Sequence, residues 1–513
     1  MTKMSATDKI RFTSDDLDLF SSASGDRNPL HCSAEYARRT AYGKPVVFGV
    51  LAGLYTLSRL NQQQTRRVQQ IILGFAGAMF TDIDYTLHVT HDDADSAILE
   101  LRDGSRVMLT VDVVFEQCEA AATFDPGHSL FPCCEPADRT FCDLTTDLSL
   151  TGAYRPALDD LRLLIDRLDL SDIGIDEVQL GTLLWASYIV GMELPGERAL
   201  FGRLAIDFGA RSLRSAGPLE YTAEVVAVDE RFEMLRYRAA ILTNSTHWAD
   251  VEVWSFVRRD LPEVDNIQLR HVLGESETLE GKVALITGAS RGLGAAITRA
   301  MVLQGCTVHA NYRDCHTEAK QLQTRLEGAP GKVVLAQGDA TDPRWARDAS
   351  RKIDATGKGI DFLICNACPA TIPMSIDLDS IERFNEYVSQ SVSMVSTALA
   401  AFLDMLAGNS GLVVIISSSY VDDVPLHLPH YVCAKNAIEG LAKAAAIEYP
   451  NVAFLIVRPP RLLTDLTNVP MGHADAIAPE RVAADLVRRL AERPPAGDVH
   501  YLVCFDPRLE PVT

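Results

Sequence analysis

The chain has 513 residues, of which 47% are hydrophobic and 23% are charged, and its formal net charge at pH 7 is −21. A chain of this length predicts about three domains at roughly 150 residues each. The negative charge argues against nucleic acid as a partner, because binding phosphates requires a basic surface. The sequence has no uncharged apolar run of about 18 residues, so we expect no membrane span.

The N-terminal segment and the cysteines favour a cytoplasmic protein. The N-terminus lacks the apolar core of a signal peptide, and the 11 cysteines are scattered and odd in number, which is typical of reduced thiols. Cys365 and Cys368 have C-x-x-C spacing, but no second pair lies at zinc spacing, so we expect no metal there. One loop is an alternative metal site, with Cys133, Cys134, Cys142 and the nearby His128.

The stretch at residues 20–53 begins with the run Ser-Gly-Asp-Arg-Asn-Pro-Leu-His. Asp26 and His31 lie on a turn rich in Gly, Asn and Pro, and such a turn can direct both side chains to one point. A carboxylate and an imidazole that converge on one water form an acid–base pair. Residues 46–60 are apolar on nearly every face, which predicts a buried helix, and Gly49 near its start can offer a backbone amide to a carbonyl oxygen.

This stretch resembles the MaoC-like hydratase family, also called the R-specific enoyl-CoA hydratases, over about residues 10–118. The family motif S-G-D-x-N-P-x-H, with an alanine six residues after the histidine, is matched in full. The resemblance implies a hot-dog fold in which Asp26 and His31 hold the water that adds to, or leaves from, a 3-hydroxyacyl thioester. It also implies that Gly49 supplies the oxyanion contact, although Phe48 stands where the family often has histidine.

The remainder of this region is predicted to complete a sheet. Alternating apolar residues predict strands over residues 71–79, 83–89, 96–101 and 107–115, which suits a sheet wrapped on the buried helix. Four basic residues around the motif form either a solvated face or contacts to the phosphates of a coenzyme A or phosphopantetheine arm: Arg27, Arg38, Arg39 and Lys44.

The middle of the chain repeats the order of the first region. A helical pattern over residues 176–188 is followed by strand-like segments at 221–228, 235–242 and 247–257, but the D-x-N-P-x-H motif does not recur. We therefore expect a second hot-dog repeat without catalytic residues. This order is similar to that of double hot-dog hydratases, in which one half carries the chemistry and the other helps to hold the acyl chain.

The C-terminal region opens with an apolar strand at residues 283–286, a turn with three glycines and a helix from about Leu293. Glycine lets the backbone approach a pyrophosphate, and the free amides at a helix start attract anions. Further on, Tyr431 and Lys435 lie four residues apart on one helix face. A phenol beside an ammonium is a tuned proton donor, because the cation favours the phenolate and lowers the pKa of the tyrosine.

This region resembles the short-chain dehydrogenase/reductase family over nearly its whole length. The family's T-G-x-x-x-G-x-G loop is present, and the family's tyrosine and lysine match Tyr431 and Lys435. The resemblance implies that Ser418, rather than its neighbours Ser417 and Ser419, is the catalytic serine, because it lies 13 residues before the tyrosine. The residues expected to bind a dinucleotide are Thr287, Gly288, Ser290, Arg291, Gly292, Leu293, Gly294, Arg313, Asp339, Ala340, Asn366, Ala367, Tyr431, Lys435 and Thr464.

The choice between NAD and NADP follows from charge. An acid at the end of the second strand would accept hydrogen bonds from the ribose 2′-hydroxyl of NAD. Tyr312 takes that place here, with Arg313 next to it and Arg291 in the glycine loop. Two guanidinium groups suit a 2′-phosphate, so we expect NADP(H) as the cofactor.

Three positions depart from the family pattern. The usual N-N-A-G is replaced by a run from Cys365 to Cys368, which explains the apparent C-x-x-C motif. Ser391 stands where the family has an asparagine that anchors a proton-relay water, and Pro460 replaces the glycine of a P-G pair. The expectation of a working reductase rests on the intact serine, tyrosine and lysine.

Together these patterns predict an α+β double hot-dog region followed by an α/β Rossmann-type domain with a doubly wound parallel sheet. The expected domains are a catalytic hot-dog at 1–120, a linker at 121–154, a second hot-dog at 155–262, a linker at 263–280 and a reductase domain at 281–513.

The combined resemblance implies a bifunctional enzyme that reduces a 3-oxoacyl thioester with NADPH and then removes water to give the 2-enoyl thioester. The substrate would be an acyl-CoA or acyl-carrier-protein thioester in fatty-acyl or polyketide-type synthesis. The alternatives are the oxidative direction, a reductase whose hot-dog pair only binds an acyl carrier or forms a dimer interface, and a reductase of a non-thioester carbonyl. Hot-dog proteins and short-chain reductases usually associate in pairs, so we expect a homodimer or homotetramer.

Overall fold

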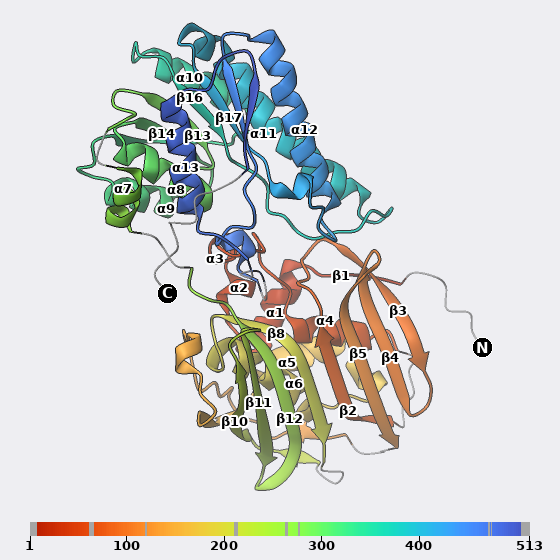
Figure 1. Ribbon diagram of the computed structural model, residues 1–513. Helices are drawn as coiled ribbons and strands as arrows, with labels where there is room; N and C mark the ends of the chain where they lie inside the picture. The colour runs from red at the N-terminus through yellow and green to blue at the C-terminus, as the bar shows by residue number, and fades with distance from the viewer. Residues whose placement is uncertain are drawn as a thin grey trace. The chain divides into compact units, whose positions relative to one another are not determined.

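The computed structural model describes residues 8–60, 66–117, 121–209, 214–261, 265–274, 277–469, 472 and 475–503. The chain divides into two compact units. The first contains Met1–Asp260 and Val469–Met471, and the second contains Leu261–Asn468 and Gly472–Thr513. Figure 1 shows one unit built around an antiparallel sheet and another around a parallel sheet.

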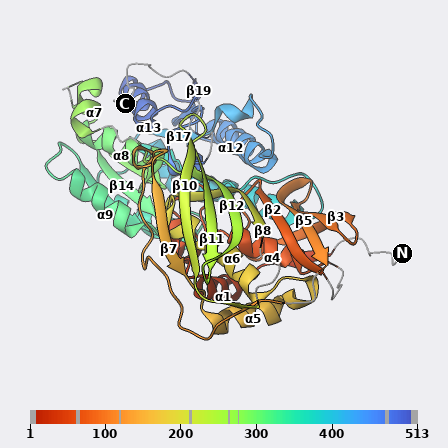
Figure 2. The same cartoon turned by 90° about the horizontal axis from the view of Figure 1, so that it is seen from below.

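One continuous antiparallel sheet of ten strands forms the first unit (Figure 2). The two halves of the sheet meet where β2 pairs with β8, with Ile71 opposite Ile206. In order across the sheet the strands are β1 (Lys9–Arg11), β3 (Asp84–Asp92), β4 (Ser96–Asp103), β5 (Arg106–Gln117), β2 (Arg66–Phe75), β8 (Ala199–Phe208), β12 (Thr246–Val257), β11 (Met234–Thr243), β10 (Leu219–Asp229) and β7 (Ser149–Tyr154).

Each half of this sheet carries one central helix. These helices, α4 (Gly49–Leu57) and α6 (Glu177–Tyr188), are apolar around most of their circumference and almost entirely buried. A turn of π-helix, Ile189–Glu193, continues α6. The arrangement confirms the predicted double hot-dog fold. The remaining helices of the unit are α1 (Ser14–Ser24), α2 (Pro29–Cys32), α3 (Ala34–Ala37) and α5 (Leu158–Leu168), and β6 (Thr123–Phe124) pairs with β9 (Ser215–Ala216).

The end of the expected linker at 121–154 is part of the sheet. Strand β7 pairs with β10 as an edge strand, with Leu219 opposite Tyr154. Its sequence is too polar and too short to be recognised as a strand alone, and its central residue is Gly152. A Cβ at Gly152 would lie 2.5 Å from the hydroxyl oxygen of Tyr221, so the glycine leaves room for that ring.

The second unit has a seven-stranded parallel sheet with helices on both faces, which confirms the predicted doubly wound fold. Its strand order is β15 (Lys332–Gln337), β14 (Thr307–Tyr312), β13 (Val283–Thr287), β16 (Phe362–Cys365), β17 (Leu412–Ile416), β18 (Ala453–Val457) and β19 (Val499–Leu502). The helices are α7 (Asn266–Leu273), α8 (Gly292–Leu303), α9 (His316–Arg325), α10 (Pro343–Asp354), α11 (Ile381–Gly408), α12 (Pro429–Glu448) and α13 (Pro479–Glu492).

The segment expected as a linker at 263–280 contains α7, which belongs to this unit. Asp265 caps the helix by accepting a 2.7 Å hydrogen bond from the backbone nitrogen of Gln268. Leu269 is fully buried in the core beneath α8 and α13. The helix has one buried position in a polar and acidic sequence, which explains why the pattern did not predict it.

Helix α11 is the one described helix whose length and composition would allow it to cross a membrane. Its most apolar window has a mean hydropathy of 1.5, and 44% of that window is buried. Val395, Leu399 and Phe402 on this helix are buried in the core on one face of the parallel sheet. A core helix of such a sheet meets the same length and composition test, so the fold itself accounts for this apolar helix.

Candidate active sites

Asp26 lies at the end of α1 and is 2% exposed. Gly25 ends the helix in the left-handed region with φ of 72°, which turns the chain sharply before the aspartate. One carboxylate oxygen, Oδ1, accepts a 3.1 Å hydrogen bond from the backbone nitrogen of Asn28. The other, Oδ2, accepts a 2.7 Å hydrogen bond from the hydroxyl of Ser187. Both oxygens therefore have donors inside the protein.

Two residues of the second repeat lie against this carboxylate, and no sequence pattern pointed to either. Ser187 is the donor on α6, and Gly191 lies in the π-helical turn that follows. A Cβ at Gly191 would lie 2.3 Å from Oδ1 of Asp26, so only glycine permits the approach. A π-helical turn is often found at functional sites. The second repeat thus supplies part of the wall around Asp26 although it lacks the motif.

Burial raises the pKa of Asp26 to about 7, and the hydrogen bonds from Ser187 and Asn28 oppose this shift. At neutral pH the carboxyl group is therefore divided between its protonated and ionised forms. Such a group can donate or accept a proton at little cost, which is the property required of a general acid–base catalyst.

His31 lies on α2, whose first turn is capped by Asn28. Its Nδ1 lies 2.7 Å from the carbonyl oxygen of Val46, which accepts a hydrogen bond and so assigns the proton to Nδ1. The lone pair is then on Nε2. Burial lowers the pKa of His31 to about 4, the Val46 carbonyl opposes the shift, and the charge of Arg258 adds to it. His31 is therefore neutral at pH 7.

Phe48 and Gly49 lie at the start of α4. The ring of Phe48 stacks on the His31 ring with centroids 4.1 Å apart, so the residue that replaces the family's usual histidine packs against the imidazole. Gly49 begins the helix, and no side chain caps that end. A Cβ on Gly49 would lie 2.7 Å from Cε1 of Phe75. Gly49 is therefore closely packed, and the backbone amides at this helix start have no acceptor within the helix.

The four basic residues near the motif do not form one cluster around Asp26. Arg39 pairs with Glu35 at 3.0 Å, and Lys44 lies 4.9 Å from the centroid of the Phe80 ring. Arg27 is exposed, and Arg38 donates to the carbonyl oxygen of Ala34 at 3.2 Å. Contacts from these residues to phosphates stay a prediction.

In the second unit, the glycine loop lies between β13 and α8. Thr287 is 1% exposed, and its hydroxyl oxygen accepts hydrogen bonds from the backbone nitrogens of Asn366 and Ala367 at 3.1 and 3.2 Å. The side chain of Asn366 donates to the carbonyl oxygen of Gly288 at 2.9 Å. These contacts tie the loop to the end of β16 and hold its backbone in place.

The glycines of the loop fit a dinucleotide. Gly288 has φ of 66° and Gly292 has φ of 53°, a region that favours glycine. A Cβ on Gly294 would lie 2.1 Å from the carbonyl oxygen of Gly288, so the helix and the loop approach too closely for any other residue. Arg291 precedes α8 and does not cap it with its side chain. The first amides of α8 thus have no side-chain acceptor and can meet the pyrophosphate.

The basic residues expected to contact a 2′-phosphate have acidic neighbours. Arg313 lies 2.8 Å from Asp314 and 3.5 Å from Asp339, and half of its side chain is exposed. Arg291 lies 3.6 Å from Asp465. Three other residues expected to bind the cofactor are at least partly buried: Ser290, Leu293 and Ala340. Thr464 lies close to the glycine loop, with its Cγ2 3.5 Å from the position that a Cβ on Gly292 would take.

Tyr431 and Lys435 lie on one face of α12, as predicted from their spacing, with the ammonium 5.4 Å from the ring centroid. The Lys435 ammonium donates to the carbonyl oxygen of Ile416 at 2.8 Å and is 6% exposed. Burial raises the pKa of Tyr431 above its usual range, and the Ser418 hydroxyl opposes the shift. The expected lowering by Lys435 does not appear, because burial is the largest influence on the pKa of Tyr431.

The neighbours of these residues have structural roles. The hydroxyl of Ser417 donates to Glu439 at 2.6 Å, which leaves Ser418 as the serine beside Tyr431. Ser391 is 8% exposed and donates to the carbonyl oxygen of Tyr387 at 2.8 Å. Its hydroxyl hydrogen is thus used within α11, and only its oxygen remains available to a water.

Within the described residues, no group of three or more His, Cys, Asp and Glu side chains is arranged to hold a metal ion. The loop considered as an alternative metal site therefore does not form one. Its cysteines are free thiols, as are Cys365, which is buried in β16, and Cys368. Cys365 is the last residue of β16, and Cys368 lies in the segment that follows this strand.

Comparison with family models supports both halves of this picture. The model of the MaoC like domain matches residues 2–114, and that of the short chain dehydrogenase matches residues 282–470. The chain joins a MaoC-like domain to a short-chain dehydrogenase domain. Both domains belong to families of enzymes, one of the dehydratase type and one of the oxidoreductase type. The matched residues include the Asp26 and His31 motif and all of the catalytic residues expected in the dehydrogenase domain.

Several known proteins are similar to part of the chain. L-rhamnose 1-dehydrogenase (NAD(P)(+)) of Sphingomonas sp. is 28% identical over 172 residues, which cover 33% of this chain and 67% of that protein. The 3beta-hydroxysteroid dehydrogenase 1 of Eggerthella lenta is 26% identical over 211 residues, or 40% of this chain and 79% of that protein. A solved structure of an alcohol dehydrogenase from the archaeon Thermococcus sibiricus, complexed with 5-hydroxy-NADP, has 26% identity and a TM-score of 0.40, and covers 45% of this chain and 99% of its own.

Proposed function

We propose that the chain is a bifunctional enzyme that reduces a 3-oxoacyl thioester and dehydrates the resulting 3-hydroxyacyl thioester. The observation that carries the proposal is the presence in one chain of two candidate acid–base sites, one in a MaoC-like domain and one in a short-chain dehydrogenase domain. One consists of Asp26 and His31, and the other of Ser418, Tyr431 and Lys435. The product of the reductase is the substrate of the dehydratase.

In the dehydrogenase domain, a nicotinamide cofactor would supply a hydride to C3 of the substrate. The glycine loop and the amides at the start of α8 bind its pyrophosphate. The hydroxyl of Ser418 orients the substrate carbonyl, and Tyr431 donates a proton to the alkoxide oxygen. Lys435 binds the nicotinamide ribose, as its buried position beside Tyr431 supports.

In the hot-dog domain, the environments of Asp26 and His31 support the following proposed roles. Neutral His31 removes the proton from C2 with Nε2, because its other nitrogen donates to Val46. Protonated Asp26 donates to the leaving hydroxyl, because its raised pKa keeps a large protonated fraction at neutral pH. The backbone amides at Gly49 stabilise the negative charge that forms on the thioester oxygen. Hydration is the same sequence in reverse.

The cofactor that we propose is NADP(H). Arg313 and Arg291 would meet a 2′-phosphate, and Tyr312 stands at the end of β14 where an acid would accept from a 2′-hydroxyl. The name of the similar L-rhamnose 1-dehydrogenase includes NAD(P)(+), which covers both cofactors. NADPH is the usual reductant in synthesis, so this choice favours reduction over the oxidative direction.

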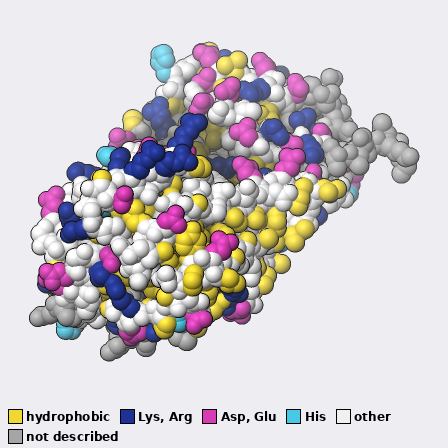
Figure 3. All heavy atoms as spheres, turned by 90° about the horizontal axis from the view of Figure 1, so that it is seen from above, with side chains coloured by type: hydrophobic (Ala, Val, Ile, Leu, Met, Phe, Trp, Pro, Cys, Tyr) yellow, Lys and Arg dark blue, Asp and Glu magenta, His cyan; other side chains and the backbone are white. Residues whose placement is uncertain are grey.

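A homodimer or homotetramer is also proposed. Large hydrophobic side chains are exposed on the dehydrogenase domain, among them Ile447 on α12, which is 83% exposed. Figure 3 shows hydrophobic side chains gathered between charged ones on the face seen from above. Light scattering after size-exclusion chromatography tests this point, and a monomeric mass at micromolar concentration would contradict it.

The proposal is tested with the full chain, NADPH and a short 3-oxoacyl thioester, followed by mass spectrometry of the product. The expected product has gained two hydrogens and lost water. Asp26→Asn should stop the sequence at the 3-hydroxyacyl thioester, and Tyr431→Phe should abolish reduction while a supplied 3-hydroxyacyl thioester is still dehydrated. If Asp26→Asn gives the unchanged enoyl product, the dehydratase assignment is wrong. Reduction of a free ketone as fast as the thioester would favour a reductase of non-thioester carbonyls.

A further inference from the structure

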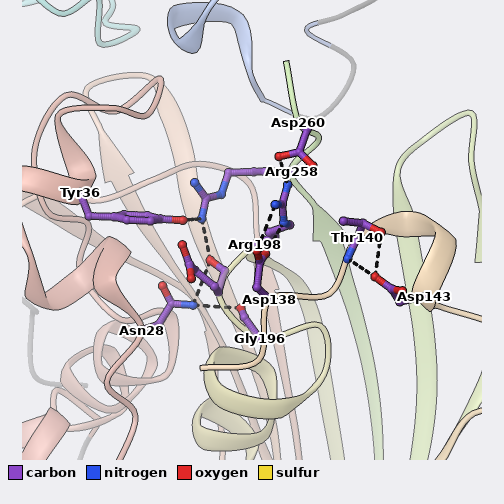
Figure 4. A network of polar contacts seen from close by, with 10 residues as sticks. Asn28, Tyr36, Asp138, Thr140, Asp143, Gly196, Arg198, Arg258 and Asp260 are labelled. Atoms are coloured by element: carbon purple, nitrogen blue, oxygen red, sulfur yellow. Dashed lines mark hydrogen bonds and ion pairs between the residues drawn. The ribbon is translucent and has the colours of Figure 1, made fainter. Parts of the chain in front are cut away.

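Arg258 is a buried guanidinium that the catalytic scheme above does not use. The residue follows β12 directly and is 8% exposed. Its Nη2 donates to the hydroxyl of Tyr36 at 2.8 Å and to the carbonyl oxygen of Glu197 at 2.6 Å. Figure 4 shows the guanidinium between the strand end of the second repeat and the ring of Tyr36. The guanidinium carbon lies 5.4 Å from the centroid of that ring.

A short chain of hydrogen bonds connects Arg258 to the catalytic turn. The carbonyl oxygen of Glu197 that accepts from Arg258 also accepts from the side chain of Asn28 at 3.4 Å. The backbone nitrogen of Asn28 donates in turn to Asp26 at 3.1 Å. The charge of Arg258 also reaches His31, where it acts with burial to lower the pKa of the imidazole. The guanidinium therefore lies beside the acid–base pair.

The charge of Arg258 has no ion-pair partner within the described part of the chain. Its hydrogen bonds go to a hydroxyl and a carbonyl, and its buried Nε has no acceptor at all. The neighbouring Arg198 differs, because it contacts Asp138 at 2.5 Å and Asp260 at 2.6 Å (Figure 4). The Glu197 carboxylate faces the Tyr36 hydroxyl instead of the guanidinium.

A buried charge is costly unless it is paired, and the planar fork of a guanidinium is suited to two oxygens of one anion. We infer that Arg258 is the binding site for an oxyanion carried by the substrate of the hot-dog domain, so that the missing counter-ion arrives with the substrate. This inference rests on the proposed hydratase function. The oxyanion is either a carboxylate on the acyl group or the phosphate of the carrier arm. The place of Arg258 beside Asp26 favours the carboxylate, because the whole pantetheine arm separates the phosphate from the reacting carbons.

The experiment compares hydration of three thioesters by the full chain, followed as loss of the enoyl absorbance. They are 2-butenoyl-pantetheine, which carries no anion, 2-butenoyl-4′-phosphopantetheine, and the pantetheine monothioester of 2-butenedioic acid. Arg258→Gln should lower kcat/KM about 10- to 100-fold more for the thioester whose anion it binds than for the neutral thioester, so the readout is the ratio between the two substrates. Arg198→Gln, which removes a paired guanidinium of the same network, should show no dependence on the anion.

Each outcome decides the point. A loss that is larger for the carboxylated thioester than for the neutral one assigns an acyl carboxylate, and a loss that is larger for the phosphorylated thioester assigns the carrier phosphate. An equal loss on all three, or none, overturns the inference and leaves Arg258 with a purely structural role. If the unsubstituted protein hydrates none of them, the proposed function fails, and calorimetry with the unreactive butanedioyl-pantetheine and butanoyl-4′-phosphopantetheine still tests the anion site. If each of these two unreactive thioesters binds the Arg258→Gln protein as tightly as the unsubstituted protein, the inference of an anion site is overturned.

Discussion

Ser187 donates a 2.7 Å hydrogen bond to Oδ2 of Asp26, across 161 positions of the sequence and between the two hot-dog repeats. The repeat without the motif thus supplies a hydrogen bond that favours the ionised form of the Asp26 carboxyl group in the other repeat. A hydrogen bond to the ionised form lowers the pKa of a carboxyl group, while burial raises it. For Asp26 burial is the larger effect, and the pKa is about 7.

The first prediction concerns Ser187→Ala. In the proposed mechanism, Asp26 and His31 together carry one proton in the active state. The hydration rate should therefore depend on pH as a bell-shaped curve between the His31 pKa of about 4 and the Asp26 pKa of about 7. Removing the Ser187 donor destabilises the ionised carboxylate and raises the pKa of Asp26 further, by about one unit. The high-pH limb of kcat/KM for hydration should therefore move to higher pH, with the low-pH limb unchanged. A limb that stays in place would show that Ser187 does not affect the ionisation.

The second prediction concerns Gly191→Ala. A Cβ at this position would lie 2.3 Å from Oδ1 of Asp26, so the carboxylate or the π-helical turn must move. A displacement of about 1 Å at a reacting group can lower the rate about 100-fold. We expect a loss of this order in hydration, measured as kcat/KM, with unchanged NADPH-dependent reduction in the same preparation. Full hydratase activity in a folded variant would contradict the close approach.

The third prediction tests the cofactor loop with Gly294→Ala. The new Cβ would meet the carbonyl oxygen of Gly288 at 2.1 Å and the side chain of Asn366 at 2.7 Å. Because the Gly288 oxygen belongs to the backbone, it cannot move without shifting the loop, and we expect the shifted loop to lose the pyrophosphate site. Fluorescence titration should show NADPH affinity lowered at least tenfold. The control is Gly440→Ala on α12, where no atom lies within 4 Å of the added Cβ, and its NADPH affinity should be unchanged.

The fourth prediction tests the cofactor choice with Arg313→Gln. A guanidinium that binds a 2′-phosphate contributes a charge-assisted hydrogen bond worth about 1.5–3 kcal/mol. The KM for NADPH should rise about 10- to 100-fold while the KM for NADH changes little. Steady-state kinetics with both cofactors give the ratio. Equal changes with NADPH and NADH would show that Arg313 only stabilises the loop through Asp314 and Asp339.

Local patterns in the sequence determined the fold class and most of both candidate sites. The D-x-N-P-x-H run, the glycine loop and the Tyr431–Lys435 pair each lie within a few residues, so backbone geometry alone brings their side chains to one turn or one helix face. The alternation of strands and helices likewise predicted both sheets. These local patterns did not predict strand β7 and helix α7, which are short and polar. Strand β7 depends on its contact with Tyr221, and α7 depends on the burial of Leu269 in the core.

Only the tertiary structure decided which residues surround the catalytic groups. Ser187 and Gly191 lie far from Asp26 in the sequence and share no motif with it, and they meet it in the sheet that β2 and β8 join. Arg258 is connected to Asp26 through Glu197 and Asn28. The pKa values of Asp26 and His31 follow from the burial that this pairing creates. Spacing placed Tyr431 and Lys435 on one helix face, as predicted, but burial in the folded domain raises the pKa of Tyr431, where the pair alone predicted a lower value.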